Sequence, residues 1–327
     1  MVEQILSNLF KMEIPLPGSP LKAVNSYFIR DPERSLIIDT GMNREECLES
    51  MLSNLEKLKV DLSKTDFFIT HLHADHLGLV GKLATEGSKI YFSEMEAFTL
   101  ASDLRRLNDP HREFFPFFLS QGFPEDELQR AFKKHPGYHY SPKRRLNFHI
   151  LKEGDSITYG GYSFECIETP GHTPGHMCLY EPQKKILVCG DHILIDITPN
   201  ITFWPELENA LKHYLASLEK VSSLSVDLVL PGHRRLWNDH RGRIVELKEH
   251  HENRLDEVLI ALKDGDKTAW EVAPHITWDI KFSSWAEFPP VQKWFAIGET
   301  IAHINYLEAD QKIWKRKENG TIFYSMK

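Results

Sequence analysis

The sequence predicts an α/β fold in which helices cover layered β-sheets, followed by a small C-terminal domain of a different kind. Over the first two thirds of the chain, short apolar runs alternate with helical stretches, and several runs are joined by hairpin-like turns. The 327 residues allow two domains, and a composition of 41% hydrophobic and 26% charged residues is typical of a globular protein rather than a disordered one.

Strands are expected where a short apolar run is bounded by turn residues. The first two runs are separated by Asp31-Pro32-Glu33, which indicates a hairpin-like connection. The compact run at 67–69 leads directly into a segment rich in histidine. The expected strands span residues 25–29, 36–38, 67–69, 148–151, 162–168, 177–180, 185–189 and 227–230.

Helices are expected between these strands. One opens at Asn43, with acidic residues in its first turn that suit the helix dipole, and another covers 205–221. Residues 108–147 break the strand pattern and predict a helical insertion. Its aromatic rings either pack locally between helices or form a wall over a site. These rings belong to Phe114, Phe115, Phe117, Phe118 and Phe123.

The C-terminal quarter predicts two helices and a hairpin that follow a long polar helix. The polar helix covers 241–264, and further helices are expected over 267–273 and 291–307. Asn319-Gly320 between two apolar runs is a strong hairpin signal. This order of elements is the outline of a winged helix.

Several protein classes are disfavoured by the sequence. No apolar run approaches the roughly 18 residues of a transmembrane helix, and the N-terminus lacks a signal-peptide pattern, so we expect a cytoplasmic protein with no membrane segment. The four cysteines are widely spaced and are expected to be reduced and buried. A formal net charge of −8 argues against a general nucleic-acid binder.

The placement of the 17 histidines points to metal, because histidine is the commonest metal ligand. Four metal-capable side chains directly follow the strand at 67–69: His71, His73, Asp75 and His76. If the chain is still extended at 71–73, its period of two places both imidazoles on one side. A turn then brings Asp75 and His76 toward the same space, so that the cluster can serve two adjacent metals.

Three further segments place a metal-capable residue beside a glycine just past an expected strand. Glycine permits the tight backbone path that brings several loops to one point. The segments are Thr169-Pro170-Gly171-His172-Thr173-Pro174-Gly175-His176, Gly190-Asp191-His192 and Pro231-Gly232-His233. Sites commonly gather at strand ends, so one site built from separate loops is predicted.

The series H-x-H-x-D-H, G-H, G-D and G-H resembles the metallo-β-lactamase superfamily of binuclear hydrolases, and Ile38-Asp39-Thr40-Gly41 is similar to an early turn of that family. The resemblance covers roughly residues 20–240 and implies a four-layer αββα sandwich. It implies that His71, His73 and His172 hold one metal, that Asp75, His76 and His233 hold the other, and that Asp191 bridges them.

The tail from about residue 252 resembles the winged-helix-like C-terminal domain of the lactamase-beta-2-like and glyoxalase-II-like branch. We therefore expect a catalytic domain at 1–251, with its helical insertion at about 108–147, and a winged-helix-like domain at 252–327. Two histidines adjoin the implied ligands. His176 is expected to hold a ligand or loop in place or to begin the next strand, and His192 either faces the substrate or packs.

The donor set implies hydrolytic chemistry. Nitrogen and carboxylate donors without thiolate suit Zn²⁺ best, with Mn²⁺, Fe or Co as alternatives. The resemblance implies two metal ions whose bridging hydroxide attacks a carbonyl or phosphoryl centre. Asp75 is expected to act as the catalytic residue that orients the hydroxide and takes up its proton.

Departures from individual branches narrow the substrate. His73 stands where flavodiiron-type relatives carry glutamate, and Asp191 is usually absent from zinc-dependent β-lactamases. Leu77-Gly78-Leu79 differs from the Gly-Gly of glyoxalase-II-like members, and the segment from Asp191 to His233 is too short for the domain inserted in related nucleases. These departures favour a small-molecule ester, thioester or lactone as substrate.

An RNA- or nucleotide-directed phosphodiesterase is the alternative, followed by a non-catalytic metalloprotein or sensor. The alternative is motivated by the winged-helix-like tail and its basic residues Lys312, Lys315, Arg316 and Lys317. Nucleic acid is not favoured as a partner because the chain is acidic. Winged helices also serve as dimer elements, so a homodimer is a further alternative.

Overall fold

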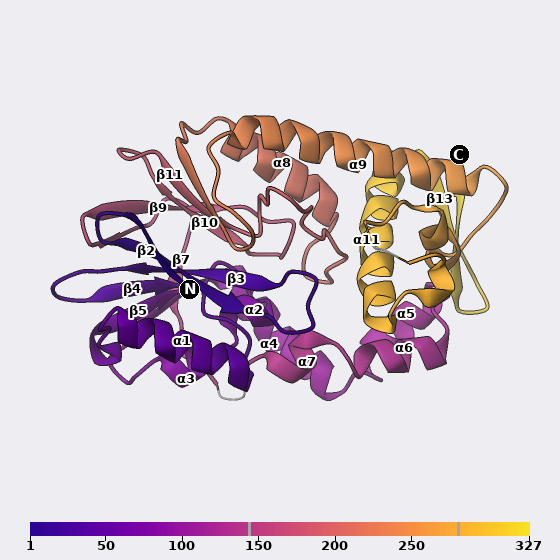
Figure 1. The fold of residues 1–327 in the computed structure, drawn as a ribbon. Helices are drawn as coiled ribbons and strands as arrows, with labels where there is room; N and C mark the ends of the chain where they lie inside the picture. The colour runs from indigo at the N-terminus through magenta and orange to yellow at the C-terminus, as the bar shows by residue number, and fades with distance from the viewer. Residues whose placement is uncertain (143–144, 280–281) are drawn as a thin grey trace.

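Two β-sheets face each other, and helices cover both outer faces (Figure 1). The computed structural model describes residues 1–142, 145–279 and 282–327. Helices α1 and α3 lie outside the first sheet, and α8 and α9 lie outside the second (Figure 1). This arrangement confirms the predicted four-layer αββα sandwich. Residues 143–144 of the predicted insertion lie outside the described residues.

The first sheet has seven strands in sequential order and the second has five in the order β12-β11-β10-β9-β8. The strands of the first sheet are β1 (Val2–Leu6), β2 (Leu9–Pro15), β3 (Ala23–Ile29), β4 (Ser35–Ile38), β5 (Thr65–Phe68), β6 (Ile90–Ser93) and β7 (His149–Leu151). Those of the second are β8 (Ser156–Tyr159), β9 (Tyr162–Glu168), β10 (Met177–Glu181), β11 (Ile186–Gly190) and β12 (Leu228–Pro231).

The helices divide between the sandwich, the insertion and the C-terminal unit. Those up to the insertion are α1 (Glu45–Lys57), the 3-10 helix η1 (Leu62–Lys64), α2 (Ala74–Leu77), α3 (Val80–Leu83), α4 (Glu94–Asn108), α5 (Phe114–Ser120), α6 (Glu125–Phe132) and α7 (Pro136–Tyr140). The remainder are α8 (Ala210–Ser222), α9 (His240–Leu262), α10 (Ala269–Val272), η2 (Ala273–His275), η3 (Trp285–Glu287) and α11 (Pro290–Ala309). The chain ends in a hairpin of β13 (Ile313–Glu318) and β14 (Thr321–Met326).

Successive side chains of a strand point to opposite faces of its sheet and therefore pack into different layers. Leu36 and Ile38 of β4 pack into the core between the sheets, whereas Ile37 packs on the other side with Met51 of α1. The predicted turn at Asn319-Gly320 has left-handed backbone at both residues, with φ of 47° and 88°. Such backbone angles fit a two-residue hairpin turn.

The insertion and the C-terminal unit share a second hydrophobic core. Phe115, Phe118 and Phe123 are buried with Trp294 and Ile297 of α11. These three rings therefore pack as structural residues, and their partners lie in the C-terminal unit. In the described part of the chain, no helix combines the length and apolarity needed to cross a bilayer. The four cysteines are buried and free.

The expected helix at 205–221 begins later than predicted, at Ala210. Asn209 adopts a left-handed conformation with φ of 56°, and its side chain accepts a hydrogen bond from the backbone N–H of Lys212. This cap fixes the helix start, and the residues before it form turns instead. The sequence also left β1, β2, β6 and β8 unpredicted.

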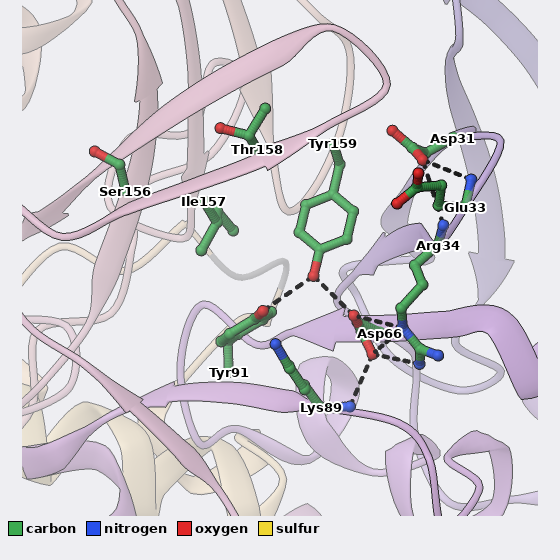
Figure 2. A pocket seen from close by; sticks show the side chains of 10 residues that line it. All are labelled: Asp31, Glu33, Arg34, Asp66, Lys89, Tyr91, Ser156, Ile157, Thr158 and Tyr159. Carbon is green, nitrogen blue, oxygen red and sulfur yellow. Dashed lines mark hydrogen bonds and ion pairs between the residues drawn. The ribbon is translucent and has the colours of Figure 1, made fainter.

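A buried carboxylate, Asp66, joins the two sheets (Figure 2). It lies in β5, whose far end leads to the histidine-rich segment. Asp66 of β5 accepts a hydrogen bond of 2.8 Å from the Tyr159 hydroxyl of β8 and forms an ion pair of 2.7 Å with Arg34. Burial opposes ionisation, but Arg34, the backbone N–H of Lys89 and Tyr159 outweigh it and lower the pKa of Asp66. Asp66 is therefore an ionised inter-sheet contact.

The substitution Asp66→Asn is expected to lower the free energy of unfolding by about 2 kcal/mol at neutral pH, because it leaves Arg34, which is only partly exposed, without its charged partner. Folding depresses the pKa of Asp66, so its stabilisation is full above the unfolded pKa and is lost as the pH falls through the folded value. Urea titrations should show the difference in unfolding free energy between wild type and variant staying constant between about pH 7 and about pH 5 and narrowing as the pH falls toward about 3. A difference that stays constant over the whole range would contradict this role.

Candidate metal centre

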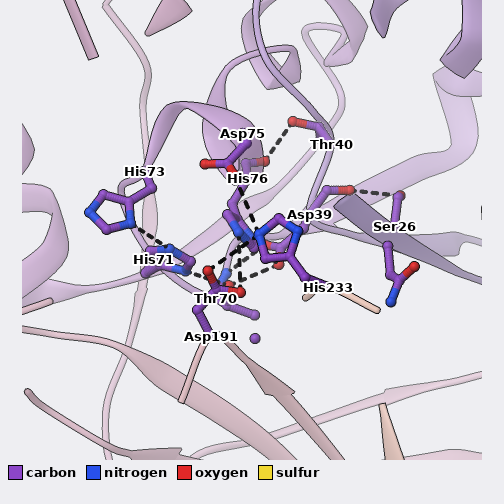
Figure 3. A network of polar contacts seen from close by, with 12 residues as sticks. Ser26, Asp39, Thr40, Thr70, His71, His73, Asp75, His76, Asp191 and His233 are labelled. Atoms are coloured by element: carbon purple, nitrogen blue, oxygen red, sulfur yellow. Dashed lines mark hydrogen bonds and ion pairs between the residues drawn. The ribbon is translucent and has the colours of Figure 1, made fainter. Parts of the chain in front are cut away.

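The separated histidine and aspartate segments converge at one end of the two sheets (Figure 3). His71 follows β5, and His73 is the N-cap of α2, so that Asp75 and His76 project from the first turn of that helix. The other three segments follow strands of the second sheet. His172 follows β9, Asp191 directly follows β11, and His233 follows β12.

The structure brings together all seven residues that the resemblance implies as ligands. Their donor atoms form three groups, with the atoms of each group within 4.8 Å of one another: His71, His73 and His172; His71, His76 and Asp191; and Asp75, His76 and His233. Asp191 Oδ2 lies 3.8 Å from His172 Nε2 and 3.3 Å from His233 Nε2. Asp191 therefore lies between the first and third groups.

The donor atoms fit divalent cations. His76 Nε2, His233 Nε2 and Asp191 Oδ1 are buried and have no hydrogen-bond partner among the residues that the structure describes. Buried polar atoms without partners are costly, and a cation held among them would satisfy all three. Gly232 leaves room at this point, because a Cβ atom there would lie 2.3 Å from Asp191 Oδ1.

The first and third donor groups differ in the charge of their imidazoles. Burial lowers the pKa of His73 to about 3 and that of His71 well below its usual value, so these imidazoles are neutral, which is the form that binds metal. Burial also acts on His233, but the carboxylates of Asp191 and Asp75 outweigh it and raise its pKa to about 10. The carboxylates thus favour positive charge at His233, which a divalent cation would supply in place of the imidazole proton.

Asp39 fixes the orientation of His76 by binding the ring nitrogen that faces away from the cluster. Its carboxylate accepts hydrogen bonds from His76 Nδ1 at 2.7 Å and from the backbone and hydroxyl of Thr70 at 2.9 and 2.8 Å. Thr40 adds a hydrogen bond from its hydroxyl to the carbonyl of His76 at 2.7 Å, and Ser26 donates to the carbonyl of Asp39 (Figure 3). The bond at Nδ1 leaves the Nε2 atom of His76 free to face the cluster.

The substitution Asp39→Asn is expected to weaken metal binding about 10- to 100-fold, because an amide has only one oxygen acceptor and cannot accept both from His76 and from the backbone N–H of Thr70. Asparagine tolerates the left-handed backbone at this position, where φ is 57°, so the fold should persist. Titration against a chelating indicator measures the affinity, and circular dichroism checks the fold. If the folded variant binds metal with unchanged affinity, Asp39 does not support metal binding.

The two ambiguous histidines are fully buried. His176 Nδ1 lies 2.7 Å from the Thr169 hydroxyl, and His176 Nε2 accepts a hydrogen bond of 3.2 Å from the backbone of Asp191. His176 thus supports the loop that carries Asp191. His192 lies between His176 and Tyr214, with ring centroids 6.0 and 5.4 Å away, which is a packing position.

Several residues of the centre carry no signal in the sequence. Glu96 of α4 is buried and accepts hydrogen bonds from the backbone N–H groups of Leu72 at 2.5 Å and Gly175 at 2.7 Å. It therefore ties together the two loops that carry His71, His73 and His172. Trp204 stacks near His73, with ring centroids 6.1 Å apart. These contacts are distant in sequence, so no local pattern reveals them.

The comparisons with known proteins agree with this geometry. Residues 20–233 match the family described as the metallo-beta-lactamase superfamily. A probable metallo-hydrolase of Bacillus subtilis is 26% identical over 88% of this chain and 89% of its own length. An atrochrysone carboxyl ACP thioesterase of Aspergillus fumigatus is 24% identical over 76% of this chain and 64% of its own length.

A solved structure shows the same fold. The crystal structure of a metallo-beta-lactamase family protein from Thermus thermophilus has a TM-score of 0.83 and 28% identity, and the match covers 99% of this chain and 100% of that one. The matched region contains all seven converging residues. The chain therefore belongs to the metallo-beta-lactamase superfamily and is a hydrolase of that superfamily.

Proposed function

We propose that this protein is a binuclear metal-dependent hydrolase that cleaves small-molecule esters, thioesters or lactones with an apolar acyl group. The position of Asp191 carries the proposal, because its carboxylate contacts both His172 and His233, which belong to separate donor groups. We assign His71, His73 and His172 to one metal ion, Asp75, His76 and His233 to the other, and Asp191 to both.

Two divalent cations, for which this nitrogen and carboxylate donor set favours zinc, supply Lewis acidity and lower the pKa of water. The protein side chains orient the reaction. Asp75 and Asp191 keep 8% and 6% of their surface exposed, whereas His71, His76 and His233 are fully buried. His73 is more exposed than either carboxylate, so substrate approaches over His73 and the two carboxylates. Asp75 is ionised at neutral pH, because nearby His76 and His233 outweigh burial and lower its pKa to about 2. Its carboxylate orients the attacking water and accepts its proton.

An aromatic ring beside His73, and a stacked pair of rings that adjoins it in the chain, support an apolar acyl group. Trp204 stacks near His73, and the adjacent Phe203 stacks on Phe117 of the insertion with ring centroids 4.3 Å apart. Phe117 and Phe203 are only partly buried, unlike the neighbouring Phe115 and Phe118. The relative described as a thioesterase supports the same substrate class.

The charges of the C-terminal hairpin disfavour an RNA-directed phosphodiesterase. Lys312 lies 2.9 Å from Asp310, Lys315 lies 3.2 Å from Glu308, and Arg316 forms ion pairs with Asp266 and Glu318. Three of the four basic residues that motivate this alternative are therefore already paired with carboxylates, which leaves less charge for a phosphate backbone.

Metal-loaded protein should hydrolyse medium-chain acyl thioesters and aryl esters and should lose this activity on treatment with a chelator. The panel should also include a lactone and bis-(p-nitrophenyl) phosphate. The variant Phe117→Ala is expected to raise KM for a medium-chain acyl substrate more than for an acetyl substrate, with Leu119→Ala on the exposed side of α5 as the matched control. Turnover of the phosphodiester without turnover of any acyl substrate would overturn the proposed substrate class.

A further inference from the structure

One loop, residues 200–204, holds His172 at both its ring and its backbone. His172 Nδ1 donates a hydrogen bond of 2.8 Å to the carbonyl of Asn200. The indole N–H of Trp204 donates a hydrogen bond of 3.0 Å to the carbonyl of His172. Because a carbonyl only accepts, the first bond places the ring proton on Nδ1 and leaves Nε2 free to face the cluster.

This loop rests on helix α11 of the C-terminal unit. The side-chain amide of Asn200 donates a hydrogen bond of 2.6 Å to Glu299 Oε2, and the backbone N–H of Phe203 donates one of 3.1 Å to the carbonyl of Gly298. A Cβ atom at Gly298 would lie 2.1 Å from the hydroxyl of Thr202, so a larger residue would force Thr202 to move. The contact between loop and helix is therefore specific.

Glu299 is in turn held by α9. Its Oε1 atom forms an ion pair with Arg254, whose guanidinium also donates a hydrogen bond of 3.0 Å to the carbonyl of Thr277 and lies 4.5 Å from the ring centroid of Trp278. Arg254 and Glu299 are only 6% and 4% exposed. A buried ion pair adds little net stability over apolar residues of similar size, whereas its directional bonds fix Glu299 toward Asn200.

We infer that Glu299 is a positioning residue for His172, acting through Asn200, and that the C-terminal unit thereby forms part of the metal centre. This inference rests on the metal assignment proposed above. It gives the C-terminal unit a function within this chain that needs no nucleic acid or partner protein. Loss of the Asn200–Glu299 bond is expected to affect the metal held by His172 and to spare the other.

The test is a Co²⁺ titration of full-length apoprotein, followed by its visible absorption and by competition with a chelator. Asn200→Ala keeps the carbonyl that accepts from His172 but removes the bond to Glu299, and Glu299→Gln retains an acceptor for Asn200 while removing the charge. Asn200→Ala is expected to weaken one of two dissociation constants about 10- to 100-fold and to alter the spectrum, with a smaller effect for Glu299→Gln. The other constant should stay unchanged.

The matched control is Lys293→Met, which removes the buried ion pair of 2.9 Å between Lys293 of the same helix and Glu127. It should leave both constants unchanged. If Asn200→Ala keeps both Co²⁺ dissociation constants within about twofold of wild type, the inference fails. If Glu299→Gln does not fold, the result for Asn200→Ala alone decides whether the inference holds. If wild type binds no Co²⁺, or if His172→Ala changes neither constant, the proposed metal assignment itself fails.

Discussion

Replacement of Asp191 by alanine should abolish hydrolysis and remove most of the bound metal. Its Oδ2 atom lies 3.8 Å from His172 Nε2 and 3.3 Å from His233 Nε2, so one substitution takes a donor from both proposed metal sites. It also removes the carboxylate that contributes most to the raised pKa of His233. We expect activity to fall by at least about 10³-fold, together with metal content measured by elemental analysis.

The control for this substitution is Asp227→Ala. Asp227 precedes β12, its side chain is 69% exposed, and it pairs with Lys185 at 3.4 Å. Its loss should change neither metal content nor turnover. An Asp191→Ala variant that keeps full metal content and full activity would refute the assignment.

Replacement of Asp75 by asparagine should lower kcat by about 10²- to 10⁴-fold, because the amide cannot accept the proton of the attacking water. Asparagine has nearly the same volume, so the packing of α2 should persist. His76 and His233 stay in place, and metal content should therefore fall less than in Asp191→Ala. Turnover under substrate saturation, divided by the metal content of the same sample, separates the two effects.

The metal-normalised rate decides the role of Asp75. If Asp75→Asn loses activity only in proportion to its lost metal, its metal-normalised kcat equals that of wild type. Asp75 is then a ligand without a separate part in proton transfer, and the catalytic role proposed for it is wrong.

The predictable parts of this fold have local signals. The histidine-rich segment follows a buried strand, as predicted, and His71, His73 and His76 meet in one cluster. Asn319-Gly320 forms the expected hairpin turn because few other pairs tolerate two left-handed residues. The glycines beside His172, Asp191 and His233 likewise mark tight turns that are visible in the sequence.

The parts that escaped prediction depend on contacts between distant segments. Phe115 and Phe118 form a helix in the insertion, but only the fold shows that their partners come from α11. Glu96 supports the candidate metal centre through two backbone N–H groups, and such contacts leave no pattern along the chain. The same reason hides Asn200 and Glu299, which are joined across 99 residues.

The number of zinc ions bound per folded chain tests the central claim most directly. Native mass spectrometry of apoprotein titrated with Zn²⁺ should show two ions per wild-type chain, because Asp191 joins two groups of donors that are otherwise separate. Saturation of the folded protein at one ion, or no zinc binding at all, would contradict the binuclear centre.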